Sequence, residues 1–111
     1  MPIRRLAMAF AAVCAAAFGL SPALAADPAA GRTKATMCRA CHGIDGVAKI
    51  PTAPHIAGES TIYLQTQLKA FRSGKRVHEV MSVIAKQLSD DDIANLAAWY
   101  SSIQFTVKVP E

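Results

Sequence analysis

The apolar positions near the C-terminal end recur at the spacing of an amphipathic helix, with one face formed by Ile93, Leu96, Ala97 and Tyr100. Ser89 stands in front of this stretch as a helix cap, and the acidic residues 90–92 complement the positive end of the helix dipole. The pair Ser101-Ser102 follows the last apolar turn. The pattern therefore predicts a helix that begins after Ser89 and ends near Ser102.

A second apolar stripe predicts a helix over residues 59–73, with Leu64, Leu68 and Phe71 at helical spacing and Tyr63 beside them. Ser60 can cap this helix and Gly74 can end it. Basic residues gather around its end, namely Lys69, Arg72, Lys75 and Arg76. Such a cluster is usually a solvated face, and guidance of docking to an acidic partner is the alternative.

An earlier segment predicts a further helix. Asp27 suits the cap, Pro28 suits the first position, and the helix would run to about Cys41 and stop at Gly43. Gly31 is costly inside a helix. Either another backbone or ring approaches closely at this glycine, or the glycine is merely tolerated.

The remaining segments connect or follow these helices. Residues 43–58 are rich in glycine and proline and lack helical spacing, which predicts a loop. Residues 77–88 lead to the last helix, and residues 103–111 alternate weakly, which predicts an extended C-terminal tail. The segments together predict an all-α domain.

Residues 1–25 have the composition of an export signal. Arg4 and Arg5 precede a short, Ala-rich apolar run that ends in a small-residue cleavage pattern at Ala25. A membrane anchor left in place is the alternative, but the run is short for a membrane span. Cleavage after Ala25 would leave one domain, residues 26–111, in the periplasm and without a membrane span.

Removal of this leader changes the charge and the cysteine count. The full chain has 12 Lys and Arg against 8 Asp and Glu, a formal charge of +4, and the loss of two leader arginines lowers it to +2. We read no nucleic-acid partner from so small a charge. Cys14 lies in the leader, which leaves Cys38 and Cys41. A domain of about 86 residues has a thin core.

Cys38-Arg39-Ala40-Cys41-His42 is a C-x-x-C-H motif, the attachment pattern of c-type haem. In this chemistry both thiols form thioethers to the haem and the imidazole is an axial ligand of the iron. Three other interpretations of the motif are weaker. A zinc knuckle would need two more ligands, and a thioredoxin-like redox pair would need a longer βαβ chain around it. A disulfide between the two cysteines would leave His42 unexplained. The motif predicts one covalent haem c on Cys38 and Cys41.

Met81 is the candidate for the second axial ligand. A thioether is a soft ligand and, with histidine, completes the axial pair of an electron-transfer haem. The other methionines lie in the leader or, for Met37, beside a haem-bearing cysteine. The ordinary role of a methionine is core filling. His78 is the alternative ligand, whereas the loop residue His55 is expected to be solvated or hydrogen-bonded.

With these residues assembled, the chain resembles the bacterial class I cytochromes c, especially the domains of periplasmic dihaem cytochromes and the haem subunits of flavocytochromes. The similarity covers nearly all of residues 26–111. Besides C-x-x-C-H, it is carried by Gly43 and Gly46, by Pro51-x-x-Pro54-x-Ile56-Ala57-Gly58, by Tyr63-Leu64-x-x-Gln67-Leu68-x-x-Phe71-Arg72-x-Gly74-x-Arg76, and by Met81-x-x-x-Ala85-x-x-Leu88-Ser89-Asp90-x-Asp92-Ile93.

The resemblance implies a class I cytochrome c fold of three to four helices around one haem. His42 would be the proximal ligand and Met81 the distal ligand, and the Pro54 carbonyl would accept the His42 Nδ1 proton. Gly31 would pack where the first and last helices cross, against the aromatic pair Trp99 and Tyr100.

A haem with both axial positions filled has no site for substrate, which indicates a periplasmic one-electron carrier. Redox proteins would dock transiently at the exposed haem edge. The alternative is a dedicated cytochrome subunit that accepts electrons from a flavin- or molybdenum-containing dehydrogenase, with the tail from Gln104 to Glu111 as a handle. A catalytic or gas-binding haem would require Met81 to dissociate.

Overall fold

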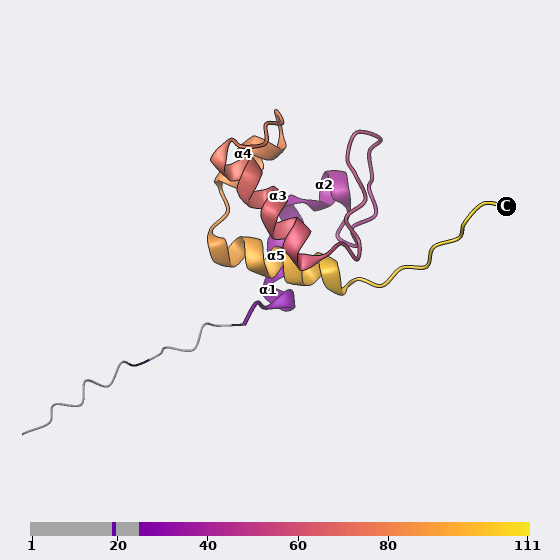
Figure 1. The fold of residues 1–111 in the computed structure, drawn as a ribbon, viewed down its shortest axis with the longest axis horizontal. Coiled ribbons are helices and arrows are strands. Elements are labelled where there is room, and N and C mark those ends of the chain that lie inside the picture. Colours follow the sequence, from indigo (N-terminus) through magenta and orange to yellow (C-terminus); the bar gives the residue numbers. More distant parts are fainter. Residues whose placement is uncertain (1–18, 20–24) are drawn as a thin grey trace, which may run out of the picture.

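The computed structural model describes residue 19 and residues 25–111, so the predicted leader lies almost entirely outside the described residues. Within residues 25–111 the chain is helical and has no strand, which confirms the all-α prediction (Figure 1). The elements are α1 (Pro28–Lys34), the 3-10 helix η1 (Ala35–Met37), α2 (Arg39–His42), α3 (Thr61–Ser73), α4 (Met81–Lys86) and α5 (Asp90–Ser102).

The core lies where α1 and α3 pack against α5, and its buried residues are Ala35, Leu64, Leu88, Ile93, Leu96, Ala97 and Tyr100. The apolar face that the sequence predicts for the last helix is thus buried in full. Side chains of the site residues Met37 and Cys38 are half-buried and pack against this core. The core therefore connects directly to the C-x-x-C-H segment.

Gly31 lies at the crossing of α1 and α5. A β-carbon on this residue would overlap the backbone carbonyl of Asn95 and would lie 2.9 Å from the Trp99 Cβ. The close approach expected at Gly31 is confirmed, but its nearest neighbours are Asn95 and Trp99. Tyr100 is not among them.

The expectation of one continuous helix from residue 28 to about residue 41 is wrong. The chain tightens into η1, where the Cys38 N–H donates to the Ala35 carbonyl three residues earlier. The Thr36 hydroxyl donates to the Thr33 carbonyl and so competes with the regular helical pattern. The short helix α2 then restarts after Cys38, which separates the haem-attachment motif from α1 (Figure 1).

The ends of α3 and α5 follow the local signals in the sequence. The Ser60 hydroxyl accepts a hydrogen bond from the Tyr63 N–H, and Gly74 ends α3 in the left-handed conformation with a φ of 82°. Ser89 and Asp92 form a capping box at the start of α5. These ends match the predicted ends to within two residues.

One member of the basic cluster has a structural role that the sequence did not predict. The Arg72 guanidinium donates to the Leu88 carbonyl at 3.1 Å and pairs with the Asp90 carboxylate at 2.5 Å. It thereby ties the end of α3 to the start of α5. The expectation of a purely solvated face is wrong for this arginine.

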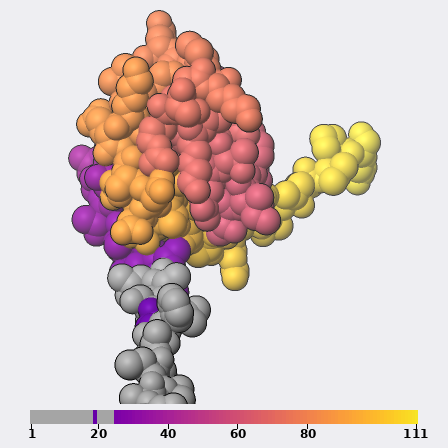
Figure 2. All heavy atoms as spheres, turned by 60° about the vertical axis from the view of Figure 1, so that its left-hand side comes forward, coloured from indigo at the N-terminus to yellow at the C-terminus, as the bar shows by residue number. Residues whose placement is uncertain are grey.

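The residues after Ser102 form no helix or strand and run away from the helices, as the yellow end of the chain shows (Figure 1 and Figure 2). Phe105 packs against Gly58, because a methyl group on that glycine would overlap the Phe105 ring. Beyond this contact Val107 and Val109 are exposed. In the described part of the chain, none of the helices has the length and apolar character needed to cross a membrane.

Asp92→Asn tests the capping box and the link between α1 and α5. The Ser89 N–H, and to a smaller extent the Lys34 ammonium at 3.2 Å, hold the pKa of Asp92 below its ordinary value of 3.8. A lowered folded-state pKa means that the carboxylate stabilises the protein above about pH 4 and loses this effect as the pH falls further. At pH 7 the variant should lose a few tenths to about 1 kcal/mol of unfolding free energy.

Denaturant titrations of the haem-loaded protein at several pH values measure this difference, which should disappear towards about pH 2. Asp91→Asn is the control, because Asp91 lies in the same turn without such hydrogen bonds among the described residues. An equal loss with the same pH profile in the control would contradict the role of the capping box.

Candidate functional site

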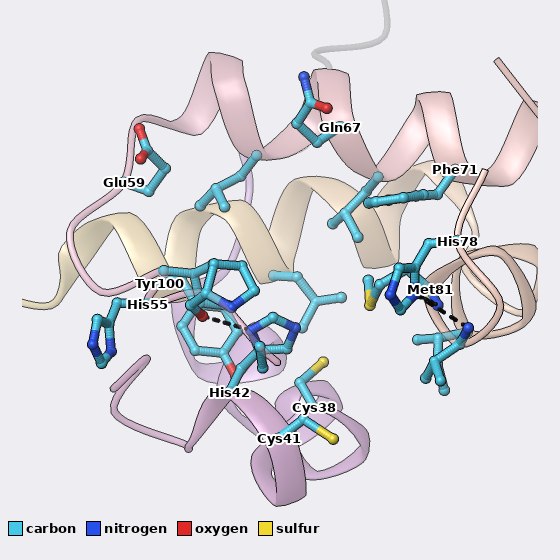
Figure 3. A pocket seen from close by; sticks show the side chains of 18 of the residues that line it. Cys38, Cys41, His42, His55, Glu59, Gln67, Phe71, His78, Met81 and Tyr100 are labelled. Atoms are coloured by element: carbon cyan, nitrogen blue, oxygen red, sulfur yellow. Dashed lines mark hydrogen bonds between the residues drawn. The ribbon is translucent and has the colours of Figure 1, made fainter. Parts of the chain in front are cut away.

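A cavity of about 600 Å³ lies between α2, the loop after it, α3, the segment leading into α4, and α5 (Figure 3). Its volume falls in the range of pockets that hold a small molecule or cofactor. The lining is mostly apolar and includes all five residues that the sequence assigned to a haem site, namely Cys38, Cys41, His42, Pro54 and Met81. The fold thus brings these five residues to one place.

Both cysteines lie on the cavity wall. Cys38 directly precedes the single turn of α2, and Cys41 lies within it. The His42 N–H donates to the Cys38 carbonyl at 2.9 Å, and Gly43 ends the turn with a φ of 77°. Both thiols are free. Burial raises the pKa of the Cys38 thiol to about 11, with smaller effects from the Tyr100 hydroxyl, which lowers it, and from Cys41, which raises it. The Cys38 thiol is therefore uncharged at neutral pH, as suits an apolar cavity.

The orientation of the His42 ring follows from its contact with the loop. Its Nδ1 lies 2.9 Å from the Pro54 carbonyl oxygen (Figure 3). A carbonyl can only accept, so Nδ1 carries a proton, and in the neutral form of this ring the lone pair lies on Nε2. The imidazole is in this way oriented so that Nε2 could bind a metal.

The loop that carries Pro54 is itself tied down. The Lys49 N–H donates to the Cys41 carbonyl at 2.8 Å, and the Ile56 N–H donates to the Gly46 carbonyl at 2.8 Å. Gly46 has a φ of 74°, and a β-carbon there would lie 2.5 Å from the Ala57 nitrogen, so the turn requires glycine. The loop therefore presents the Pro54 carbonyl at a defined position.

Two aromatic residues of α5 also hold the start of this loop, a role that the sequence did not predict. The Tyr100 hydroxyl donates to the Gly43 carbonyl at 2.9 Å, and the Trp99 indole N–H donates to the Ile44 carbonyl at 2.9 Å. The signal in the sequence was general: the polar atom of a buried tyrosine or tryptophan usually finds a partner. Which carbonyls it finds depends on the packing of α5.

Met81 is the first residue of α4 and points into the cavity from a different side than His42 (Figure 3). Its side chain is half-buried. The soft sulfur of Met81 and the Nε2 of His42 thus border one apolar space. This arrangement offers a pair of axial ligands to a flat metal complex.

The other two histidines that line the cavity, His55 and His78, both accept hydrogen bonds from the backbone at Nδ1. His78 Nδ1 accepts hydrogen bonds from the N–H groups of Val80 and Met81, each at 3.2 Å. His55 Nδ1 accepts from the Ala48 N–H at 2.8 Å. A neutral imidazole that accepts at Nδ1 carries its proton on Nε2, so neither ring has a free lone pair for iron. The geometry favours Met81 over His78, the alternative that the sequence had left open.

Arg76 is the one lysine or arginine among the residues that line the cavity. Its guanidinium donates to the Gln67 side-chain oxygen at 2.6 Å and stacks on the Phe71 ring, with 4.5 Å to the ring centre. Such a held guanidinium could bind a carboxylate at the cavity wall. The sequence analysis placed Arg76 in a basic cluster that is solvated or guides docking, and in the motif that carries the family resemblance, but gave it no role at the haem.

Comparison with known proteins identifies relatives of matching sequence and fold. Residues 25–99 match the family described as cytochrome C oxidase, cbb3-type, subunit III. The chain is 46% identical over 81 residues to cytochrome c-554(548) of Halomonas halodenitrificans, covering 70% of this chain and 98% of that protein. It is 38% identical over 106 residues to the thiosulfate dehydrogenase electron acceptor of Thiomonas intermedia, covering 94% of this chain and 46% of the relative.

The fold also matches solved structures. The crystal structure of reduced recombinant cytochrome c4 from Pseudomonas stutzeri superposes with a TM-score of 0.69 at 35% identity, over 75% of this chain and 48% of that one. The chain spans less than half the length of this cytochrome c4.

Tyr100→Phe tests the support that α5 gives to the loop. The variant keeps the buried ring and removes the hydroxyl that donates to the Gly43 carbonyl. The Gly43 carbonyl keeps a hydrogen bond from the Gly46 N–H at 3.2 Å, so denaturant titration of the haem-loaded protein should show a loss of about 0.5–1.5 kcal/mol, the net contribution of one hydrogen bond. Tyr63→Phe is the control, since Tyr63 is half-exposed at 49%. A loss in Tyr100→Phe no larger than in the control would contradict the role of the hydroxyl.

Proposed function

The chain belongs to the class I cytochrome c family, whose members transfer electrons and carry covalently bound haem c, and we propose that it moves single electrons between redox proteins in the periplasm. The observation that carries this proposal is the apolar cavity in which His42, oriented by Pro54, and Met81 border the same space. The predicted leader of residues 1–25 supports the periplasmic location.

The residues of the cavity fit one haem c. Cys38 and Cys41 would form the two thioethers, and His42 Nε2 and the Met81 sulfur would be the axial ligands. Pro54 would keep the His42 ring in place through its carbonyl. Arg76, held by Gln67, would offer its guanidinium to a haem carboxylate.

When bound, haem c supplies an iron that takes up and gives off one electron. With His42 and Met81 as its two ligands from the chain, the iron would have no position left for a substrate. The soft thioether of Met81 would favour the reduced iron, and the apolar lining would keep water away from it. The residues of the chain thus support electron transfer rather than catalysis, with partners that dock at the haem edge.

A second role rests on one relative. The thiosulfate dehydrogenase electron acceptor aligns with 94% of this chain. A chain of this kind could serve as the dedicated cytochrome subunit of a periplasmic dehydrogenase with a flavin or molybdenum cofactor. The exposed tail from Gln104 to Glu111 would be a suitable contact for the catalytic subunit, since an extended apolar segment can add to another protein's surface.

Met81→Leu tests the ligand assignment. Leucine preserves the volume but has no sulfur. The ferric protein should lose the sulfur-to-iron charge-transfer absorption, the reduced protein should bind carbon monoxide, and the reduction potential should fall by on the order of 0.1 V. Met37→Leu is the matched control, because Met37 lines the same cavity beside Cys38. Unchanged spectra in Met81→Leu, or equal changes in the control, would contradict the assignment.

Size-exclusion chromatography of a native periplasmic extract, followed by haem absorption, separates the two roles. A free carrier should elute as a monomer of about 86 residues, the length of the chain after leader removal. Elution with a larger protein that contains flavin or a metal would contradict the carrier and support the subunit. Absence of haem from the polypeptide would contradict both.

A further inference from the structure

The turn in front of α4 is organised around His78. Its Nδ1 accepts hydrogen bonds from the backbone N–H groups of both Val80 and Met81, each at 3.2 Å. These N–H groups belong to the start of α4, where the backbone has no intrahelical partners and needs an outside acceptor. The imidazole therefore supplies what a capping side chain usually supplies.

The backbone of His78 closes the same turn from the other side. Its N–H donates to the Ser82 hydroxyl at 3.0 Å, and its carbonyl accepts from the Ser82 N–H at 2.9 Å. Met81 lies between His78 and Ser82 in the chain, and His78 makes four hydrogen bonds within this turn. The ring also lies edge-on to Phe71, with 6.5 Å between ring centres and 72° between planes. The side chain is thus fixed in position although it is exposed.

We propose that His78 is a positioning residue for the axial methionine: its Nδ1 holds the Met81 backbone so that the sulfur stays in the cavity. The inference rests on the proposed function, in which Met81 is a ligand of the iron. A movement of the Met81 backbone away from the cavity would break both hydrogen bonds to Nδ1. The two bonds therefore stabilise the state in which Met81 is bound over the state in which it has left.

The same hydrogen bonds keep the histidine from replacing the methionine. A ring that accepts at Nδ1 has its proton on Nε2 and no lone pair there. To bind iron, His78 would have to give up both N–H donors of α4. The two hydrogen bonds to His78 Nδ1 thus hold Met81 in place and also prevent His78 from binding the iron.

The experiment compares two variants of similar volume at this position, His78→Asn and His78→Leu. The Oδ1 of asparagine lies at the same branch position as Nδ1 and can accept from backbone N–H groups, whereas leucine cannot. The readouts are the affinity of the reduced haem protein for carbon monoxide and the intensity of the ferric sulfur-to-iron absorption. Carbon monoxide binds only when Met81 has left, so its apparent affinity reports the open population.

His78→Leu should bind carbon monoxide about tenfold more tightly and show a weaker absorption, because two hydrogen bonds of the bound state are lost. His78→Asn should stay within about twofold of the parent protein. Glu79→Leu is the control, since Glu79 is exposed, lies in the same turn directly after His78 and does not line the cavity. It should leave both readouts unchanged.

Three results would overturn the inference: no change in His78→Leu, an increase in His78→Asn equal to that in His78→Leu, or an equal increase in Glu79→Leu. If His78→Leu yields no haem protein, His78→Ala, which also lacks an acceptor, takes its place and should show the same increase. Met81→Leu serves as the reference. If it changes neither readout, the ligand assignment fails and the inference falls with it; if it responds while His78→Leu does not, the inference alone is wrong.

Discussion

The close crossing of α1 and α5 at Gly31 is the constraint on which the site depends. Only a residue without a side chain lets the two helices approach this closely. The crossing brings the chain that continues from α1 into the C-x-x-C-H turn alongside the far half of α5. There the Tyr100 hydroxyl reaches the Gly43 carbonyl, at the start of the loop that carries Pro54. That loop orients His42, so the packing of the two helices also sets the orientation of the proposed iron ligand.

The histidines that line the cavity differ in whether they could bind a metal. In His42 the Nδ1 donates to a carbonyl, so the lone pair remains on the outer nitrogen and is available to a metal. In His78 and His55 the Nδ1 accepts from backbone N–H groups, so the outer nitrogen is protonated and is not available. The ring itself is the same in all three cases. The backbone group that faces Nδ1 decides which histidine can be a ligand.

Much of the fold was predictable because its signals are local. Ser60 and Ser89 cap the helices that they were expected to cap, since a side-chain oxygen next to free N–H groups needs no distant partner. Gly74 ends its helix for a similarly local reason. The extent of the first helix was predicted wrongly. Its change to a 3-10 turn accompanies hydrogen bonds between hydroxyl and carbonyl groups around Thr36, and the sequence pattern does not indicate these hydrogen bonds.

For the site, the sequence alone determined the chemistry that could occur. The spacing of Cys38 and Cys41 on one helical turn, with a histidine directly after them, is a short-range property that survives any tertiary arrangement. What the tertiary structure decided was how equivalent side chains are placed: Met81 and His78 both line the cavity, but the Nδ1 of His78 accepts from backbone N–H groups, and Arg76 rather than its basic neighbours lies at the cavity wall. These choices depend on which backbone groups and rings lie next to each side chain. Such neighbours come from distant parts of the chain, and only packing brings them together.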